Sequence, residues 1–253
     1  MSRVDFEKEY EILYRDIDKN FNCRVTSIMD CFTDVGLRHE DELGIDISMT
    51  NPYGVVFVFF EYDIKIDRYP KYKEKIRVKT HVDTIQKFYA SRSFEMFGES
   101  GEVIGTATSL AVVIDVEKRK LSKVPDIYYE KHGISKDTKI RPTKLKFEKL
   151  SNGTVEKEID IRFSDFDSNA HINNAKYFEW SLDAIPNDIL DKYLVSEIKI
   201  KFIKEIIGED KPKVEIEIIK GIDQIKMLHK ISNNKNEEVN IMESYWTRKE
   251  FKL

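Results

Sequence analysis

The sequence has only 2 cysteines, Cys23 and Cys31, and neither is placed as in a metal site. They lack both the C-x-x-C spacing and the neighbouring histidines that zinc sites use. The simplest interpretation is a pair of structural thiols. We therefore expect no bound metal ion and no other cofactor.

Long apolar runs are also missing. A membrane-spanning helix needs roughly 18 consecutive apolar residues, whereas the most apolar stretch, residues 54–60, has the length of a strand. Residues 1–10 are charged, and they lack the apolar core of a secretion signal and the acid-poor character of a transit peptide. We expect no membrane span and a cytoplasmic location.

An excess of positive charge is missing too. The formal net charge is −4, so no general attraction to nucleic acid is expected. The 41% hydrophobic and 35% charged residues are typical of a globular protein rather than a disordered chain. The 253 residues allow one large domain or two smaller ones, each with its own core.

The order of predicted elements in the first half is one helix followed by an antiparallel set of strands. Residues 25–36 have the apolar spacing of a helix. Strand-like alternation follows over residues 55–67, 75–83, 88–97 and 103–116, with a hairpin turn at 98–101.

The second half repeats this order. Residues 176–193 are helix-like, residues 196–203, 213–219, 224–231 and 239–246 are strand-like, and 233–236 form the matching turn. A D-x-D-x-N pattern precedes the helix in both halves, at Asp16–Asn20 and Asp165–Asn169. The short pattern recurs together with the element order, which indicates an internal duplication.

The predicted fold class is α+β, with two domains that each pack one long helix against an antiparallel sheet. The segment between the halves contains Pro125 and Pro142, several lysines and little apolar periodicity, as in a surface connector. We therefore predict a first domain over residues 1–120, a linker over 121–150 and a second domain over 151–253.

Chemistry is concentrated in front of the second predicted helix. Residues two apart in extended backbone point to the same side, so Asp167, Asn169 and His171 can present an acid, an amide and an imidazole together. The first half has Asp18, Asn20 and Asn22 there and lacks the titrating imidazole. The alternative interpretation is an Asx-rich turn that only caps the helix.

No conventional nucleophile accompanies this cluster. The sequence has no G-x-S-x-G elbow, and both cysteines lie in the other half. Activated water is therefore the better candidate. Glu205, at the end of an apolar strand, could supply a second acid or could be an ordinary solvated carboxylate. The unpaired N–H groups that begin the helix after Asn173 are suited to an acyl carbonyl oxygen.

The segments at residues 162–177 and 62–70, together with 102–115, resemble the acyl-acyl carrier protein thioesterase family in its bacterial form, over nearly the whole chain. The resemblance implies two tandem hotdog domains, with acyl-chain binding and a degenerate site in the first and catalysis in the second. It places the family's catalytic groups on Asp167, Asn169, His171 and Glu205. Plant members have a cysteine after that glutamate, whereas Ile206 stands here, so a thiol mechanism is unsupported.

The resemblance further implies hydrolysis of fatty acyl-acyl carrier protein to a free fatty acid and the carrier thiol. Hydrolysis of acyl-coenzyme A and non-enzymatic acyl binding are the alternatives, and a homodimer is left open. A hotdog hydratase fits less well, because its D-x-N-P-x-H pattern has a proline and a later histidine than His171. Candidate residues for an acyl tunnel are Met29, Phe32, Phe57 and Phe59, and those for a basic carrier-docking patch are Arg68, Lys71, Lys73, Arg141 and Lys144.

Overall fold

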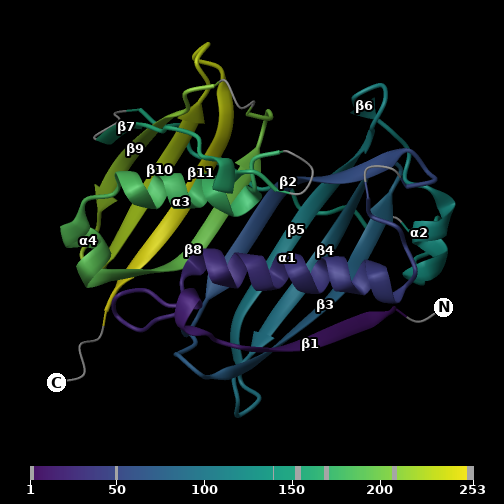
Figure 1. Ribbon diagram of the computed structural model, residues 1–253, viewed down its shortest axis with the longest axis horizontal. Helices are drawn as coiled ribbons and strands as arrows, with labels where there is room; N and C mark the ends of the chain where they lie inside the picture. The colour runs from purple at the N-terminus through teal and green to yellow at the C-terminus, as the bar shows by residue number, and fades with distance from the viewer. Residues whose placement is uncertain are drawn as a thin grey trace. The chain divides into compact units, whose positions relative to one another are not determined.

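The computed structural model describes residues 3–48, 51–138, 140–151, 155–167, 171–206 and 210–249. The chain divides into two compact units, Met1–Lys144 and Leu145–Leu253. Each unit combines helices with an antiparallel sheet, as the sequence predicts (Figure 1). In the described ranges, no helix is both long enough and apolar enough to span a membrane.

The first unit is a five-stranded antiparallel sheet in the order β1-β3-β4-β5-β2, with a short β6 added beside β5. Its elements are β1 (Asp5–Glu11), the 3-10 turn η1 (Tyr14–Asp16), α1 (Val25–Glu42), β2 (Val55–Ile66), β3 (Lys75–Gln86), β4 (Tyr89–Phe97), β5 (Val103–Asp115), β6 (Lys120–Leu121) and α2 (Asp126–Lys131). The predicted strands and the turn after β4 are confirmed.

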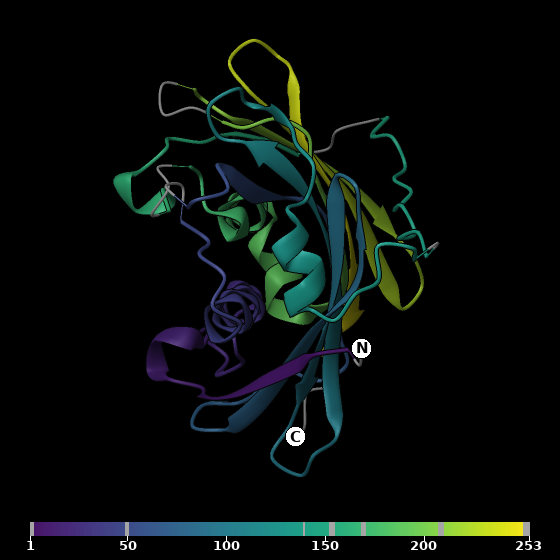
Figure 2. The same ribbon diagram turned by 90° about the vertical axis from the view of Figure 1, so that its right-hand side faces the viewer.

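Helix α1 lies against one face of this sheet and contacts β1 and β3 (Figure 1). Figure 2 views it nearly along its axis, inside the curve of the strands. Its buried residues recur at helical spacing: Val25, Ile28, Met29, Phe32, Val35 and His39. The helix is longer than predicted and ends shortly before Gly44, which has the left-handed φ of 68° that glycine tolerates.

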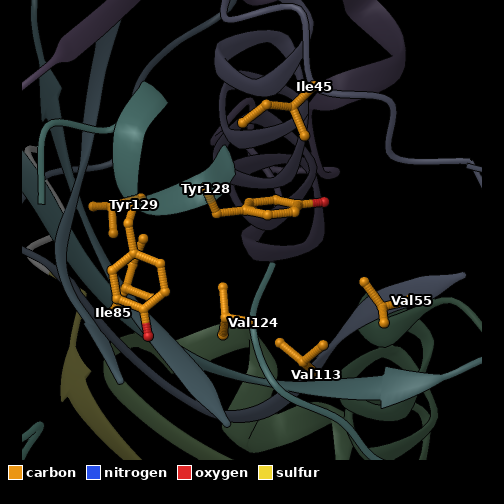
Figure 3. Close-up of a cluster of buried hydrophobic side chains, with 8 residues drawn as sticks. Ile45, Val55, Ile85, Val113, Val124, Tyr128 and Tyr129 are labelled. Atoms are coloured by element: carbon orange, nitrogen blue, oxygen red, sulfur yellow. The ribbon is translucent and has the colours of Figure 1, made fainter. Parts of the chain in front are cut away.

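Helix α2 is part of the first unit's core, although its residues fall in the predicted linker. Tyr128 and Tyr129 join a buried apolar cluster with Val124 and Val113 (Figure 3). Burial of these large side chains holds residues 124–134 to the first sheet. The structure thus divides the chain between Lys144 and Leu145, earlier than the end of the predicted linker.

A buried polar cluster also ties α2 to α1. The Glu40 carboxylate binds the buried Arg92 guanidinium on one side and His132 Nε2 at 3.1 Å on the other. Arg92 Nη1 further lies 3.0 Å from His39 Nδ1. Burial alone would raise the pKa of Glu40, but the His132 hydrogen bond and the Arg92 charge outweigh it and lower that pKa.

The second unit repeats the sheet order of the first, as β7-β9-β10-β11-β8. Its elements are β7 (Val155–Glu158), the 3-10 turn η2 (Phe163–Asp165), α3 (Asn174–Ala184), α4 (Asn187–Lys192), β8 (Tyr193–Phe202), β9 (Lys213–Lys220), β10 (Gln224–Ser232) and β11 (Glu238–Arg248). The identical order of strands and of the turn before the helix supports the predicted duplication.

The helical segment of the second unit is interrupted, which the sequence analysis did not expect. Pro186 follows α3 and forms the N-cap of α4, and the preceding Ile185 is extended, with φ −73° and ψ 135°. A residue before proline is forced out of the helical region, and proline has no N–H to continue the helix. In place of the expected helix over residues 176–193 the structure therefore has two helices, α3 and α4, and Tyr193 already belongs to β8.

The polar cluster of the first unit gives a test of stability. Glu40→Ala would leave the Arg92 charge buried without its carboxylate, so we expect a loss of about 3 kcal/mol in the free energy of unfolding, measured in urea. Because the folded pKa of Glu40 is lowered from its ordinary 4.5, this contribution is present at neutral pH and disappears as the pH falls through the folded pKa. Glu42→Ala, an exposed change on the same helix, should cost less than about 0.5 kcal/mol. Equal losses in the two variants would contradict this account.

Candidate active site

Hydrogen bonds join the two ends of the loop in front of α3. The Asp167 backbone N–H donates to the His171 carbonyl at 2.7 Å. The His171 N–H donates back to Asp167 Oδ1 at 3.1 Å, and Phe166 and Ile172 form an isolated antiparallel bridge. These contacts fix Asp167 and His171 side by side. Residues 168–170 lie outside the described residues, so the predicted site residue Asn169 has no structural account.

The start of α3 is fixed by hydrogen bonds within the same segment. Asn173 is the N-cap, and its Oδ1 accepts the Ala175 N–H at 2.9 Å. The Asn173 N–H donates to the Asp165 carbonyl at 2.9 Å, and the Lys176 N–H donates to the Asn173 carbonyl, also at 2.9 Å. The Ala175 and Lys176 amides at the start of the helix are therefore engaged within the segment, and for these two the expectation that they would face an acyl carbonyl oxygen is not met.

His171 and Glu205 meet, although they come from distant parts of the second unit. His171 Nε2 lies 2.9 Å from Glu205 Oε1, and their side chains are 35% and 32% exposed. Glu205 follows β8, where the Ile203 and Lys204 N–H groups both donate to the Val239 carbonyl, at 2.8 and 3.2 Å. The next residue, Ile206, is 1% exposed. The result is a solvent-accessible imidazole and carboxylate pair at a fixed position.

The first unit has the same loop before α1. The Asp18 N–H donates to the Asn22 carbonyl at 2.8 Å. The Asn22 N–H donates back to Asp18 Oδ1 at 3.0 Å, and Ile17 bridges Cys23 as Phe166 bridges Ile172. The aspartate therefore holds the loop in both units. Asp167 Oδ1 thus makes the side-chain-to-backbone hydrogen bond of an Asx-rich turn, as in the alternative interpretation of the sequence pattern.

The two units differ in the side chains that the shared loop presents. Asn22 stands where the second unit has His171, and its side chain binds Lys71. The Asp67 and Arg68 N–H groups donate to the Ile104 carbonyl just as Ile203 and Lys204 donate to Val239. By this register Tyr69, which is buried, corresponds to Glu205. The first unit thus has neither the imidazole nor the carboxylate of this pair.

The cysteines have the properties of structural thiols. Both are free. Burial raises the pKa of Cys23 above its ordinary range and that of Cys31 to about 12, so neither forms a thiolate at neutral pH. Among the described residues, no three His, Cys, Asp or Glu side chains are grouped so that they could hold a metal ion.

The loop of the first unit can be tested apart from any activity. Asp18 Oδ1 accepts the Asn20 N–H at 2.8 Å as well as the Asn22 N–H. Asp18→Ala removes a charged acceptor from two donors, and we expect it to lower the free energy of unfolding by about 1–2 kcal/mol. Asn20→Ala keeps both donors and should change it by less than about 0.5 kcal/mol. Denaturant titration would disprove the loop's role if the two variants were equally stable.

Both halves of the chain are similar to domains of known proteins. Residues 3–132 match the model of the acyl-ACP thioesterase N-terminal domain, and residues 148–248 match that of the C-terminal domain. A chloroplast acyl-acyl carrier protein hydrolase of Cuphea viscosissima is 24% identical over 221 residues, which cover 80% of this chain and 52% of the relative. The chain therefore spans about half the length of that plant relative.

Solved structures show the same fold. A 12:0-ACP thioesterase from Umbellularia californica superposes with a TM-score of 0.86 at 19% identity, covering 97% of this chain and 94% of the other. A provisionally assigned oleoyl thioesterase from Lactobacillus plantarum gives 0.88 at 22% identity, covering 97% of each chain. The tandem hotdog architecture is confirmed. With both domain models matched in order along the chain, this protein belongs to the acyl-ACP thioesterase family.

Proposed function

We propose that this chain hydrolyses the thioester of fatty acyl-acyl carrier protein and releases a fatty acid and the carrier thiol. The observation that carries the proposal is the 2.9 Å contact between His171 Nε2 and Glu205 Oε1. It lies in the part of the chain that matches the family's C-terminal domain. Relatives named acyl-ACP hydrolases and thioesterases add support.

The proposed chemistry is attack by water. The pair of His171 and Glu205 takes a proton from a water molecule, whose oxygen then attacks the thioester carbonyl carbon. As the carbon–sulfur bond breaks, the same proton passes from His171 to the departing sulfur. Glu205 stabilises the imidazolium that forms in between. We assign Asn169, which the family resemblance places in the site, to the carbonyl oxygen.

Direct attack by Asp167, with an anhydride intermediate, is the alternative mechanism. Asp167 Oδ1 already accepts the His171 N–H at 3.1 Å. Asp18 makes the same bond in the unit that has no imidazole. A carboxylate that serves the loop in both units is better explained as a positioning group, so we favour activated water.

We assign acyl-chain binding to the first domain and catalysis to the second. Of the candidate tunnel residues, Phe32 is fully buried and its ring lies 5.4 Å from that of Phe94. Phe57 packs 4.8 Å from Tyr128. These contacts are those of ordinary core packing, so a tunnel along these residues stays a prediction.

The carrier protein is the proposed partner, because acyl carrier proteins are acidic as a class and favour basic surfaces. Arg68 contributes little to such a surface, since it binds Glu74 and Glu102, each at 2.7 Å. Docking is therefore better assigned to the remaining predicted residues, Lys71, Lys73, Arg141 and Lys144. The cytoplasmic location and the homodimer stay predictions.

Four single substitutions test the catalytic assignment. We expect His171→Ala and Glu205→Ala each to lower kcat in a thiol-release assay by about 10²–10⁴-fold, because general acid and base catalysis contributes that much. Asp167→Asn and Asn169→Ala should also lower it. Asn22→Ala, which changes the position in the first unit that corresponds to His171, is the matched control and should leave kcat within about twofold. Unchanged turnover in all four site variants would refute the assignment.

The identity of the carrier needs its own comparison. With one acyl chain presented on acyl carrier protein and on coenzyme A, we expect kcat/KM to be higher for the protein carrier, through a lower KM. Rising salt should weaken this preference, because screening removes the attraction between opposite charges. A higher kcat/KM for acyl-coenzyme A would instead identify the chain as an acyl-coenzyme A thioesterase.

A further inference from the structure

The buried interface between α3 and its own sheet contains polar side chains that the proposed chemistry does not use. Ser181 on α3 and Asn240 on β11 are fully buried, and His229 on β10 is 2% exposed. Among the residues that the structure describes, Ser181 Oγ, His229 Nδ1 and both amide atoms of Asn240 have no hydrogen-bond partner. Because a buried polar atom without a partner is unfavourable, each of them needs a group that the described chain does not provide.

Asn240 and His229 project from the face of the sheet that α3 covers. Asn240 pairs with Phe202 of β8, and the Phe202 ring packs against Tyr177 of α3 at 5.4 Å between centroids. His229 pairs with Met242, two residues beyond Asn240 on β11. Residues two apart on a strand share a face, and so do residues directly opposite on neighbouring strands. The amide and the imidazole are therefore diagonal neighbours on this face.

The first unit has no side chain where the second has Asn240. The Ile104 and Val239 carbonyls accept the N–H groups at the end of the neighbouring strand in their respective units. The residues that follow them therefore correspond, Gly105 to Asn240. A Cβ at Gly105 would lie 3.0 Å from the Lys65 carbonyl oxygen. So close a contact with backbone leaves no space for an amide side chain at this position.

The other two polar residues replace a pair of aromatic rings. Counted from the N-caps of the two helices, Ser181 corresponds to Phe32. His229 corresponds to Phe94, since each pairs with the residue two beyond the position just compared. The Phe32 and Phe94 rings pack together at 5.4 Å between centroids, so helix and strand meet at these positions. The unit with the imidazole and carboxylate pair thus has polar groups where the other unit is apolar.

The hydrogen bonds on one side of His229 determine what its other side can do. Trp246 Nε1 donates to Ser244 Oγ at 2.8 Å, and Ser244 Oγ lies 2.7 Å from His229 Nε2. The indole can only donate, so the serine hydrogen is left for His229 Nε2. Burial lowers the pKa of His229 to about 3, which keeps the ring neutral. We therefore assign the ring hydrogen to Nδ1, which becomes a donor.

We propose that Ser181, His229 and Asn240 bind water inside the second unit, and that this water is the one consumed in the reaction. The proposal rests on the proposed thioester hydrolysis. The imidazole and the amide nitrogen donate, the amide oxygen accepts, and the hydroxyl does both. This set matches a small neutral molecule that donates and accepts hydrogen bonds. An ion would be buried there without an opposite charge on any of the three side chains.

The site lies beside the point where β8 ends and the segment with Glu205 begins. Val239, the residue before Asn240, accepts the N–H groups of Ile203 and Lys204, which directly precede Glu205. A water molecule that leaves the site on this side reaches the imidazole and carboxylate pair. The pair then takes its proton, and its oxygen attacks the thioester carbonyl carbon as described above.

A high-resolution crystal structure of the full chain tests the binding directly. In the wild type we expect an ordered water within hydrogen-bonding distance of both His229 Nδ1 and the Asn240 amide. Asn240→Leu replaces the amide by an apolar group of similar size, and this water should be absent from the variant. A wild-type site without water would overturn the proposal.

Turnover tests the role of this water. Asn240→Leu should lower kcat for thiol release about tenfold with KM unchanged, because the acyl carrier still binds while less water reaches the pair. Asn240→Ser keeps a hydrogen-bonding group and leaves room for water, so it should recover most of that loss. Asn187→Leu makes the same change as Asn240→Leu at an exposed position of the same unit, and it should leave kcat unchanged.

The remaining outcomes separate this site from the hydrolysis on which it rests. Bound water together with an unchanged kcat in Asn240→Leu would identify a purely structural water and would overturn the proposal. Equal falls in kcat in Asn240→Leu and Asn240→Ser would overturn it as well. If the wild type released no thiol from any acyl carrier, the proposed hydrolysis would fail, and the crystal structure would still decide whether the site binds water.

Discussion

The loop closed between Asp167 and His171 is the constraint on which the rest of the site depends. Two hydrogen bonds across it, at 2.7 and 3.1 Å, fix the backbone at His171 and so set the direction in which its side chain projects. The N-cap at Asn173 then joins this loop to α3, and α3 contacts β7 and β9 of its own sheet. The imidazole is thereby placed by backbone geometry, and its exposure leaves it accessible from solvent.

The sequence predicted the central strands well and the edge strands poorly. β2 to β5 and β8 to β11 have apolar alternation, which marks one buried face. β1 was not predicted, because it pairs only with β3 and carries five acidic or basic residues in DFEKEYE. β7 was missed for the same reason, since an edge strand needs little apolar surface. The packing of α2, in the predicted linker, could not be predicted from the linker's own residues either, because Tyr128 contacts residues distant in sequence.

The candidate site was predictable in part. The spacing of Asp167 and His171 indicated a shared loop, and the first unit confirms that this loop is common framework. The contact between His171 and Glu205 could not follow from spacing, because it depends on how β8 ends relative to α3. Its place at a strand end marked Glu205 as a possible second acid, and the family resemblance assigned it to the site.

A duplicated fold separates stability from chemistry in this protein. Both units keep the loop, the cap position, the strand order and the turns, so these features serve folding in each. At the site itself, the shared framework has Asn22 and Tyr69 in the first unit where the second has His171 and Glu205. Because the imidazole and the carboxylate are each about one third exposed, solvent screens their attraction and the pair adds little to stability. A contact that contributes so little to folding is better explained by its reaction than by the fold.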